Sequence, residues 1–188
     1  MFAMKRAVLA LAAVLALAGC ENDPFKPDLA PEGETRFTYS GDLTGTFEAV
    51  GRLNRRNPNA GTWAIGDMQG ASDNGVLGVF AQERSGALVS GIVLEWRAAQ
   101  VGTVTCDEDT VSCPFIANVL IDFQNTTGTS EGTYEGSVGS ITVTELTDDR
   151  AAGTFTLSLP RDVATVTPET PRLEVTGSFD VSLDLTAD

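Results

Sequence analysis

The C-terminal part of the sequence alternates strictly between apolar and polar residues. One parity holds Leu173, Val175, Gly177, Phe179, Val181, Leu183 and Leu185, and the other holds Glu174, Thr176, Ser178, Asp180, Ser182 and Asp184. A strand with one face in a core and the other in water must alternate in this way, because successive side chains point to opposite faces. Beyond Glu34 no window of useful length repeats apolar residues at helical spacing. The sequence therefore predicts an all-β fold.

The same period of two predicts further strands. Candidates are 37–49, 62–68, 76–81, 88–96, 115–123, 133–137, 141–146 and 154–159. Segments rich in Gly, Pro, Asn and Asp separate them, among them 54–59, 72–75, 124–132 and 160–171, and such residues favour turns. We expect a single antiparallel meander domain of about nine or ten strands, either a sandwich or a closed up-and-down, lipocalin-like barrel.

The first strand candidate contains two glycines. Its apolar parity runs from Phe37 to Ala49 through Gly41 and Gly45. A two-residue hairpin at Gly41 and Asp42 would place Tyr39 and Leu43 on opposite faces, so we expect one long strand bent at its glycines.

Three strand candidates carry apolar residues at both parities: 76–81, 88–96 and 115–123. Strands that are covered on both faces have this composition. The second face can be covered by the chain's own loops, by a partner subunit or by a ligand, and the pattern is compatible with all three.

A short element recurs at irregular spacing: Gly45-Thr46-Phe47, Gly61-Thr62-Trp63, Gly132-Thr133-Tyr134, Gly153-Thr154-Phe155 and Gly177-Ser178-Phe179. The aromatic ring lies on the same face as the glycine two positions earlier, so we expect it to pack over that glycine in the core. The parity of Trp63 and Trp96 likewise favours core packing over the wall of a ligand cavity.

The N-terminal residues have the pattern of an export signal. Lys5 and Arg6 precede an apolar run from Ala7 to Leu17, which is too short to span a bilayer. The segment Leu17-Ala18-Gly19-Cys20 resembles the lipobox of bacterial lipoproteins. That resemblance implies a signal helix that is cleaved before Cys20, palmitate or a similar acyl chain on Cys20, and attachment to a membrane without crossing it. Glu21, in place of Asp, implies export onward to the outer membrane.

We therefore divide the chain into a signal peptide (1–19), a lipidated tether (20–34) and an all-β domain (35–188). Pro24, Pro27 and Pro31 lie among charged residues in the tether, which favours an extended conformation.

The charge of the chain argues against nucleic acid as a partner. The formal charge of −14 becomes −16 once Lys5 and Arg6 leave with the signal, and Lys26 is then the one remaining lysine. Binding to nucleic acid depends largely on Lys and Arg side chains that neutralise phosphates. Arg55 and Arg56 form a basic pair that we interpret as solvated surface, with a grip on an acidic partner as the alternative.

With Cys20 committed to lipid, Cys106 and Cys113 remain. An exported compartment favours a disulfide between them. Their spacing differs from the C-x-x-C pattern of thiol oxidoreductases, so we expect a structural role.

The chemistry available to the chain is limited because the sequence contains no histidine. Ser-His-Asp and Cys-His mechanisms and His-based zinc sites are therefore excluded within this chain. Asp107, Glu108 and Asp109 form a weak candidate for a calcium site, against the simpler interpretation of a solvated loop, because EF-hand spacing is absent. We expect no cofactor besides the lipid. A pair of carboxylates could support glycoside hydrolysis, but no pair stands out in the sequence.

The end of the chain resembles a group of small all-β bacterial lipoproteins of unknown function. The resemblance rests on Ser140-Ile141-Thr142-Val143-Thr144, Gly153-Thr154-Phe155-Thr156-Leu157 and the segment 175–181. It implies an all-β envelope domain and gives no catalytic residues to carry over.

These observations lead to one preferred function and two alternatives. We expect a non-enzymatic, membrane-anchored envelope lipoprotein whose binding or structural β-domain has an envelope protein or surface component as its partner. The first alternative is a lipocalin-like carrier of a small apolar ligand, and the minor alternative is a carboxylate-based hydrolase.

Overall fold

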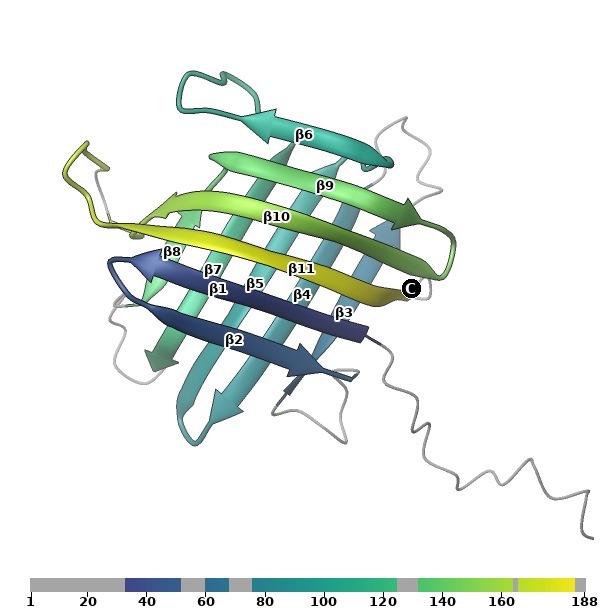
Figure 1. Cartoon of the computed structure of the whole chain (residues 1–188), viewed down its shortest axis with the longest axis horizontal. Helices are drawn as coiled ribbons and strands as arrows, with labels where there is room; N and C mark the ends of the chain where they lie inside the picture. The colour runs from purple at the N-terminus through teal and green to yellow at the C-terminus, as the bar shows by residue number, and fades with distance from the viewer. Residues whose placement is uncertain (1–32, 52–59, 68–75, 125–131, 164–165, 185–188) are drawn as a thin grey trace, which may run out of the picture. The chain divides into compact units, whose positions relative to one another are not determined.

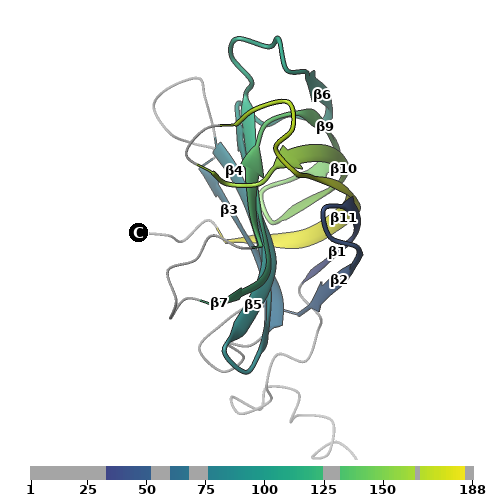
Figure 2. The same cartoon turned by 90° about the vertical axis from the view of Figure 1, so that its left-hand side faces the viewer.

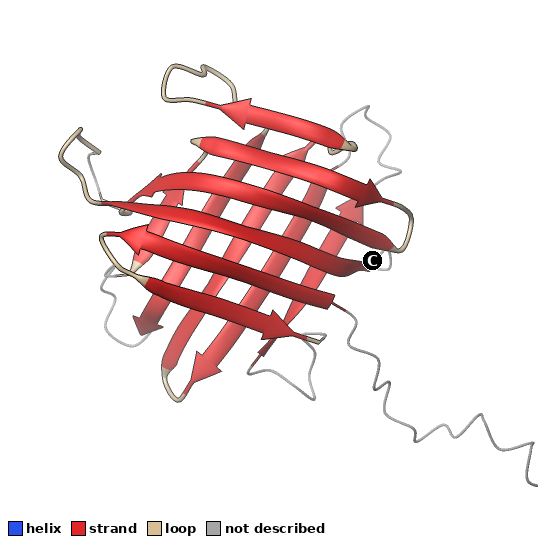
Figure 3. Ribbon diagram, in the orientation of Figure 1, coloured by secondary structure: helices blue, strands red, loops and turns tan. Residues whose placement is uncertain are grey.

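The computed structural model describes residues 33–51, 60–67, 76–124, 132–163 and 166–184, and these residues form eleven strands (Figure 3). No helix occurs among them, and so none that could cross a membrane. The chain divides into two units, 1–30 and 31–188, and all described residues belong to the second. The prediction of an all-β domain is confirmed.

Two antiparallel sheets lie face to face (Figures 1 and 2). The front sheet of Figure 1 has the order β6 (Gly102–Cys106), β9 (Gly139–Leu146), β10 (Arg150–Pro160), β11 (Arg172–Asp184), β1 (Gly33–Gly41) and β2 (Gly45–Val50). The back sheet has the order β3 (Ala60–Asp67), β4 (Val76–Ser85), β5 (Leu88–Arg97), β7 (Phe115–Gln124) and β8 (Thr133–Gly136). The arrangement is a β-sandwich.

The two sheets are connected by backbone pairing along both sides. On one side the end of β11 pairs in parallel with β3, Leu183 opposite Ala64 and Asp184 opposite Ile65. On the other side an isolated bridge joins Tyr134 of β8 to Arg161, which follows β10. Strand β11 therefore belongs to the front sheet and also reaches the back sheet.

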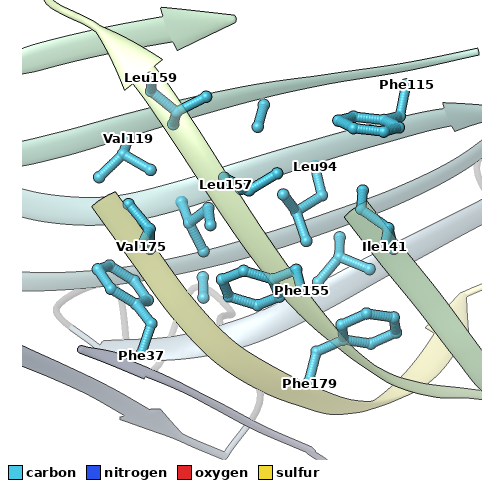
Figure 4. Close-up of a cluster of buried hydrophobic side chains, with 14 of the residues drawn as sticks. Phe37, Leu94, Phe115, Val119, Ile141, Phe155, Leu157, Leu159, Val175 and Phe179 are labelled. Carbon is cyan, nitrogen blue, oxygen red and sulfur yellow. The ribbon is translucent and has the colours of Figure 1, made fainter. Parts of the chain in front are cut away.

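The core lies between the sheets and is filled by side chains from both (Figure 4). Phe155, Leu157 and Leu159 of β10 are at most 2% exposed and meet inward side chains such as Leu94 and Val119 of the back sheet. A void of about 10 Å³ remains between the sheets, lined by Leu77, Val79, Leu94, Trp96, Ile141 and Phe179. This volume is at the lower limit for one water molecule, which needs roughly 10–15 Å³.

The glycine-aromatic elements of β10 and β11 pack against each other. Gly153 lies opposite Phe179, and Phe155 lies opposite Gly177. A Cβ at Gly153 would lie 2.7 Å from Phe179 Cζ, and one at Gly177 would lie 2.6 Å from Phe155 Cζ. Each ring thus covers the glycine of the neighbouring strand. The prediction that each ring covers the glycine two residues earlier on its own strand is wrong for these two elements, because antiparallel pairing places the ring directly opposite the partner strand's glycine.

The expectation of one long strand from Phe37 to Ala49 was wrong. Strands β1 and β2 form an antiparallel hairpin in which Tyr39 lies opposite Gly45 and Phe37 opposite Phe47. Five residues connect Tyr39 to Gly45, and an odd number keeps the apolar residues of both strands on one face. Gly41, with a φ of +101°, supplies the left-handed backbone conformation in this connection.

The predicted disulfide between Cys106 and Cys113 is present. Cys106 ends β6 at the edge of the front sheet, and Cys113 lies two residues before β7 in the back sheet. The disulfide therefore closes the loop through which the chain passes from one sheet to the other.

Removal of this disulfide should destabilise the domain moderately. On the chain-entropy model, closing so short a loop contributes about 2.5 kcal/mol. We expect the double variant Cys106→Ala/Cys113→Ala to lose about this much free energy of unfolding, measured by urea denaturation without reductant. The parent protein in reductant should lose the same amount. A parent protein that is equally stable with and without reductant would contradict the prediction.

Candidate functional site

Several residues singled out from the sequence lie outside the described residues. These are the signal, Cys20, the tether up to residue 32, and the pair Arg55 and Arg56. Trp63 belongs to β3, but its side chain is not among those described. Trp96 is 3% exposed and belongs to the core, as its parity predicted.

The acidic loop at 107–109 is described. Asp107 accepts a hydrogen bond of 2.6 Å from Thr110 Oγ1, and this bond is the main cause of the lowered pKa of Asp107. Glu108 Oε1 lies 3.0 Å from Arg172 Nη1. In the described part of the chain, no three His, Cys, Asp or Glu side chains gather as metal ligands would. Asp107 and Glu108 are therefore turned to different partners.

The outer face of the back sheet carries the second apolar parity of β4, β5 and β7. Phe80, Val93 and Leu120 are half-buried there, and Ile116 is exposed. Phe80, Val93 and Leu120 line a pocket of about 180 Å³. The structure thus places these residues outside the core.

A second, more polar pocket lies between the sheets. It has a volume of about 230 Å³, and we call it the end pocket. Strands β1 and β2 of the front sheet form one wall, and β4, β5 and β7 of the back sheet form the other. The lining residues are Tyr39, Thr46, Phe47, Glu83, Ser85, Leu88, Ser90, Ile121 and Asp122.

The end pocket forms because the inward-facing parity of the back sheet changes from apolar to polar. On β4, Leu77, Val79 and Ala81 are buried in the core, and Glu83 and Ser85 continue the same parity. On β5, Ser90 shares its parity with Ile92 and Leu94. Side chains of one parity share a face, so carboxylate and hydroxyl groups point between the sheets where apolar groups would otherwise close the core.

A β-bulge turns a further carboxylate toward the pocket. The β5–β7 register shifts between Val89 and Gly91, so that Ser90 lies opposite both Ile121 and Asp122. Asp122 has a φ of +50°, a left-handed conformation in which non-glycine residues are uncommon. Ser90 Oγ accepts a hydrogen bond of 3.0 Å from the Asp122 backbone N–H. Bulges re-aim side chains in this way, and both Ile121 and Asp122 line the pocket.

Tyr39 contributes an aromatic wall. Its ring lies over Gly45, where an added Cβ would overlap the phenol oxygen. Burial, and then the negative charge of Asp122, raise the pKa of Tyr39. The phenol is therefore neutral at physiological pH and lies within the electrostatic influence of the Asp122 carboxylate.

A half-buried ion pair fixes the hairpin that carries Tyr39. Asp42 Oδ2 accepts hydrogen bonds from Tyr134 Oη at 2.6 Å and from Arg161 Nε at 3.0 Å. The Tyr134 bond, followed by Arg161, lowers the pKa of Asp42, whereas burial and then the bond to Asp42 raise the pKa of Tyr134 to about 12. This cluster, the Asp42 latch, ties the β1–β2 turn of the front sheet to β8 of the back sheet.

Sequence reasoning did not single out the end pocket, although a signal was present. Glu83, Ser85 and Ser90 continue the alternation of the inward-facing apolar residues on β4 and β5. Polar residues at such positions indicate where the apolar core ends. The bulge at Asp122 had no such signal, because Ile121 and Phe123 continue the alternation of β7.

Comparisons with known proteins give no relative for this chain. No protein-family model, no curated protein and no solved structure matches it.

Proposed function

We propose that this chain is a lipid-anchored, non-enzymatic protein of the cell envelope, and that its β-sandwich binds a small ligand or a single partner side chain in the end pocket. The observation that carries the binding role is that polar residues occupy three inward-facing positions, Glu83, Ser85 and Ser90. These residues line a pocket of about 230 Å³. Pockets for drug-sized ligands typically measure about 300–1,000 Å³, so the occupant is smaller than these.

The anchor rests on the lipobox-like segment that ends at Cys20. Two or three acyl chains give lasting attachment, whereas one is marginal. We expect palmitate to label the native protein and the label to be absent in Cys20→Ala, with Cys106→Ala as a control that keeps it. Label retained in Cys20→Ala, or a native chain that begins at Met1, would rule out the anchor.

The filled core favours this proposal over a lipocalin-like carrier. The void of about 10 Å³ in the core is too small for an apolar ligand, and the larger end pocket carries the charged side chains of Glu83 and Asp122, whereas a carrier needs an open apolar interior. We expect a hydrophobic dye to give no saturable, stoichiometric fluorescence increase with the folded protein. A one-to-one saturable increase would favour the carrier instead.

The end pocket also gives the hydrolase alternative a specific carboxylate pair, Glu83 and Asp122. Both side chains are exposed. A carboxylic acid that must hold its proton near neutral pH usually does so in an apolar, buried setting. The exposure of both groups therefore favours binding over acid catalysis.

A further inference from the structure

We infer that the end pocket binds an alkylammonium group, a protonated amine on a short apolar stem. This inference rests on the proposed function and names the class of ligand for the same pocket. The group can belong to a free amine or to a lysine side chain of a partner, and these two sources share one chemistry.

The charge of the pocket selects for a cation. Of its nine lining residues, Glu83 and Asp122 carry negative charge and none carries positive charge. Neither carboxylate forms an ion pair within the described residues, although Asp122 accepts a 3.4 Å hydrogen bond from Ser90. An ionised carboxylate offers hydrogen-bond acceptors only, and an ammonium group offers three donors and no acceptor. The pocket and the cation are therefore complementary in both charge and hydrogen bonding.

The uncharged lining residues of the end pocket are suited to the apolar stem of the ligand. Phe47 and Ile121, both buried, supply apolar lining, and Leu88, which is exposed, adds a third apolar side chain. Tyr39 adds an aromatic ring, whose face attracts cations. An inorganic dication fits less well, because calcium takes 6–8 oxygen ligands and the described residues contain no cluster of three acidic ligands.

The size of the pocket limits the ligand to one such group. A volume of about 230 Å³ is below the range of pockets that hold drug-sized ligands. A four-carbon alkylammonium has the length of a lysine side chain, and its amine is protonated at neutral pH because the pKa of such a group is about 10.4.

The test uses the full-length protein in detergent micelles at neutral pH. n-Butylammonium chloride is titrated against the protein by isothermal calorimetry and by NMR of the backbone amides of Ser90, Ile121 and Asp122. 1-Butanol serves as the neutral analogue of similar shape. We expect saturable binding of n-butylammonium, and binding of 1-butanol that is weaker by about ten-fold or more, as for loss of a charge-assisted hydrogen bond.

Two variants test whether the carboxylates of Glu83 and Asp122 bind the ammonium group. Glu83→Gln and Asp122→Asn should each weaken n-butylammonium binding by about ten-fold. Asn, like Asp, tolerates the left-handed conformation at position 122, so the bulge should persist. Glu95→Gln is the matched control, because Glu95 is exposed on the outer face of β5 and its loss changes the net charge equally. The control should bind as the parent does.

Further probes separate the outcomes. A peptide, acetyl-Gly-Lys-Gly-amide, that binds more tightly than n-butylammonium would identify a lysine side chain as the source, and the reverse order a free amine. If 1-butanol or methyl glucoside binds in the pocket as tightly as n-butylammonium, the inference of a cationic ligand is wrong, but the proposal that the pocket binds a ligand is retained. If none of these probes, nor acetate, shifts the pocket amides saturably, the binding role in the proposed function is wrong as well.

Discussion

Replacement of Gly177 by alanine should lower the free energy of unfolding by about 4 kcal/mol, above the usual range for overpacking. An added Cβ would overlap the backbone oxygen of Arg36 and lie 2.6 Å from both Phe155 Cζ and Phe37 Cβ. The obstacle is partly backbone, so rotation of a side chain does not relieve it. For a domain of this size we expect a fall in Tm of roughly 8–16 °C, measured by thermal unfolding.

Ser178→Ala serves as the control, because Ser178 is exposed on the same strand. It should change stability by at most about 0.5 kcal/mol. A Gly177→Ala variant with the stability of the parent would show that β11 does not approach β1 and β10 as closely as described.

Replacement of Asp42 by alanine should cost about 3 kcal/mol of unfolding free energy. The variant removes the acceptor of both the Tyr134 hydroxyl and the Arg161 guanidinium. Tyr134 has no exposed surface, and the Arg161 side chain is 33% exposed. Tyr134→Phe, which removes the hydroxyl and keeps the ion pair, should cost only about 1 kcal/mol. The free energy of unfolding of both variants is measured by urea denaturation. Equal losses would contradict the conclusion that the Asp42 carboxylate is the shared acceptor of the cluster.

The latch should also give stability a specific pH dependence. The pKa of Asp42 in the folded protein lies below its ordinary value of 3.8, because Tyr134 and then Arg161 stabilise the ionised form. That contribution is complete well above pH 3.8 and is lost as the pH falls through the folded pKa. The difference in stability between the parent and Asp42→Asn should thus be constant above about pH 5 and shrink below about pH 4. A difference that grows on acidification would contradict the assignment.

Much of the fold could be predicted because one physical rule governs most of these strands. Strands such as β10 and β11 have one face in the core and one in water, so their sequences alternate. Strand β6 escaped prediction because it is a short edge strand in which only Cys106 is buried. The β1–β2 hairpin was missed because its connection preserves the apolar parity, so that a bent strand and a hairpin give the same pattern.

The candidate site was harder to predict because it depends on register between strands. That Glu83 and Ser90 face inward follows from their parity. That they meet Tyr39 depends on how the front sheet lies over the back sheet, and parity along one strand carries no information on this point. Asp122 reaches the pocket through a bulge, and a bulge reverses the parity of every residue after it.

Strand β11 pairs with β1, β10 and β3, so the last strand of the domain bonds to the first and reaches both layers. A nascent chain that lacks these final residues has neither a complete front sheet nor the parallel pairing between the sheets. The sandwich therefore assembles only after its whole length is available, since contacts this distant in sequence form late. If the chain is exported as we propose, this topology postpones folding until translocation is over.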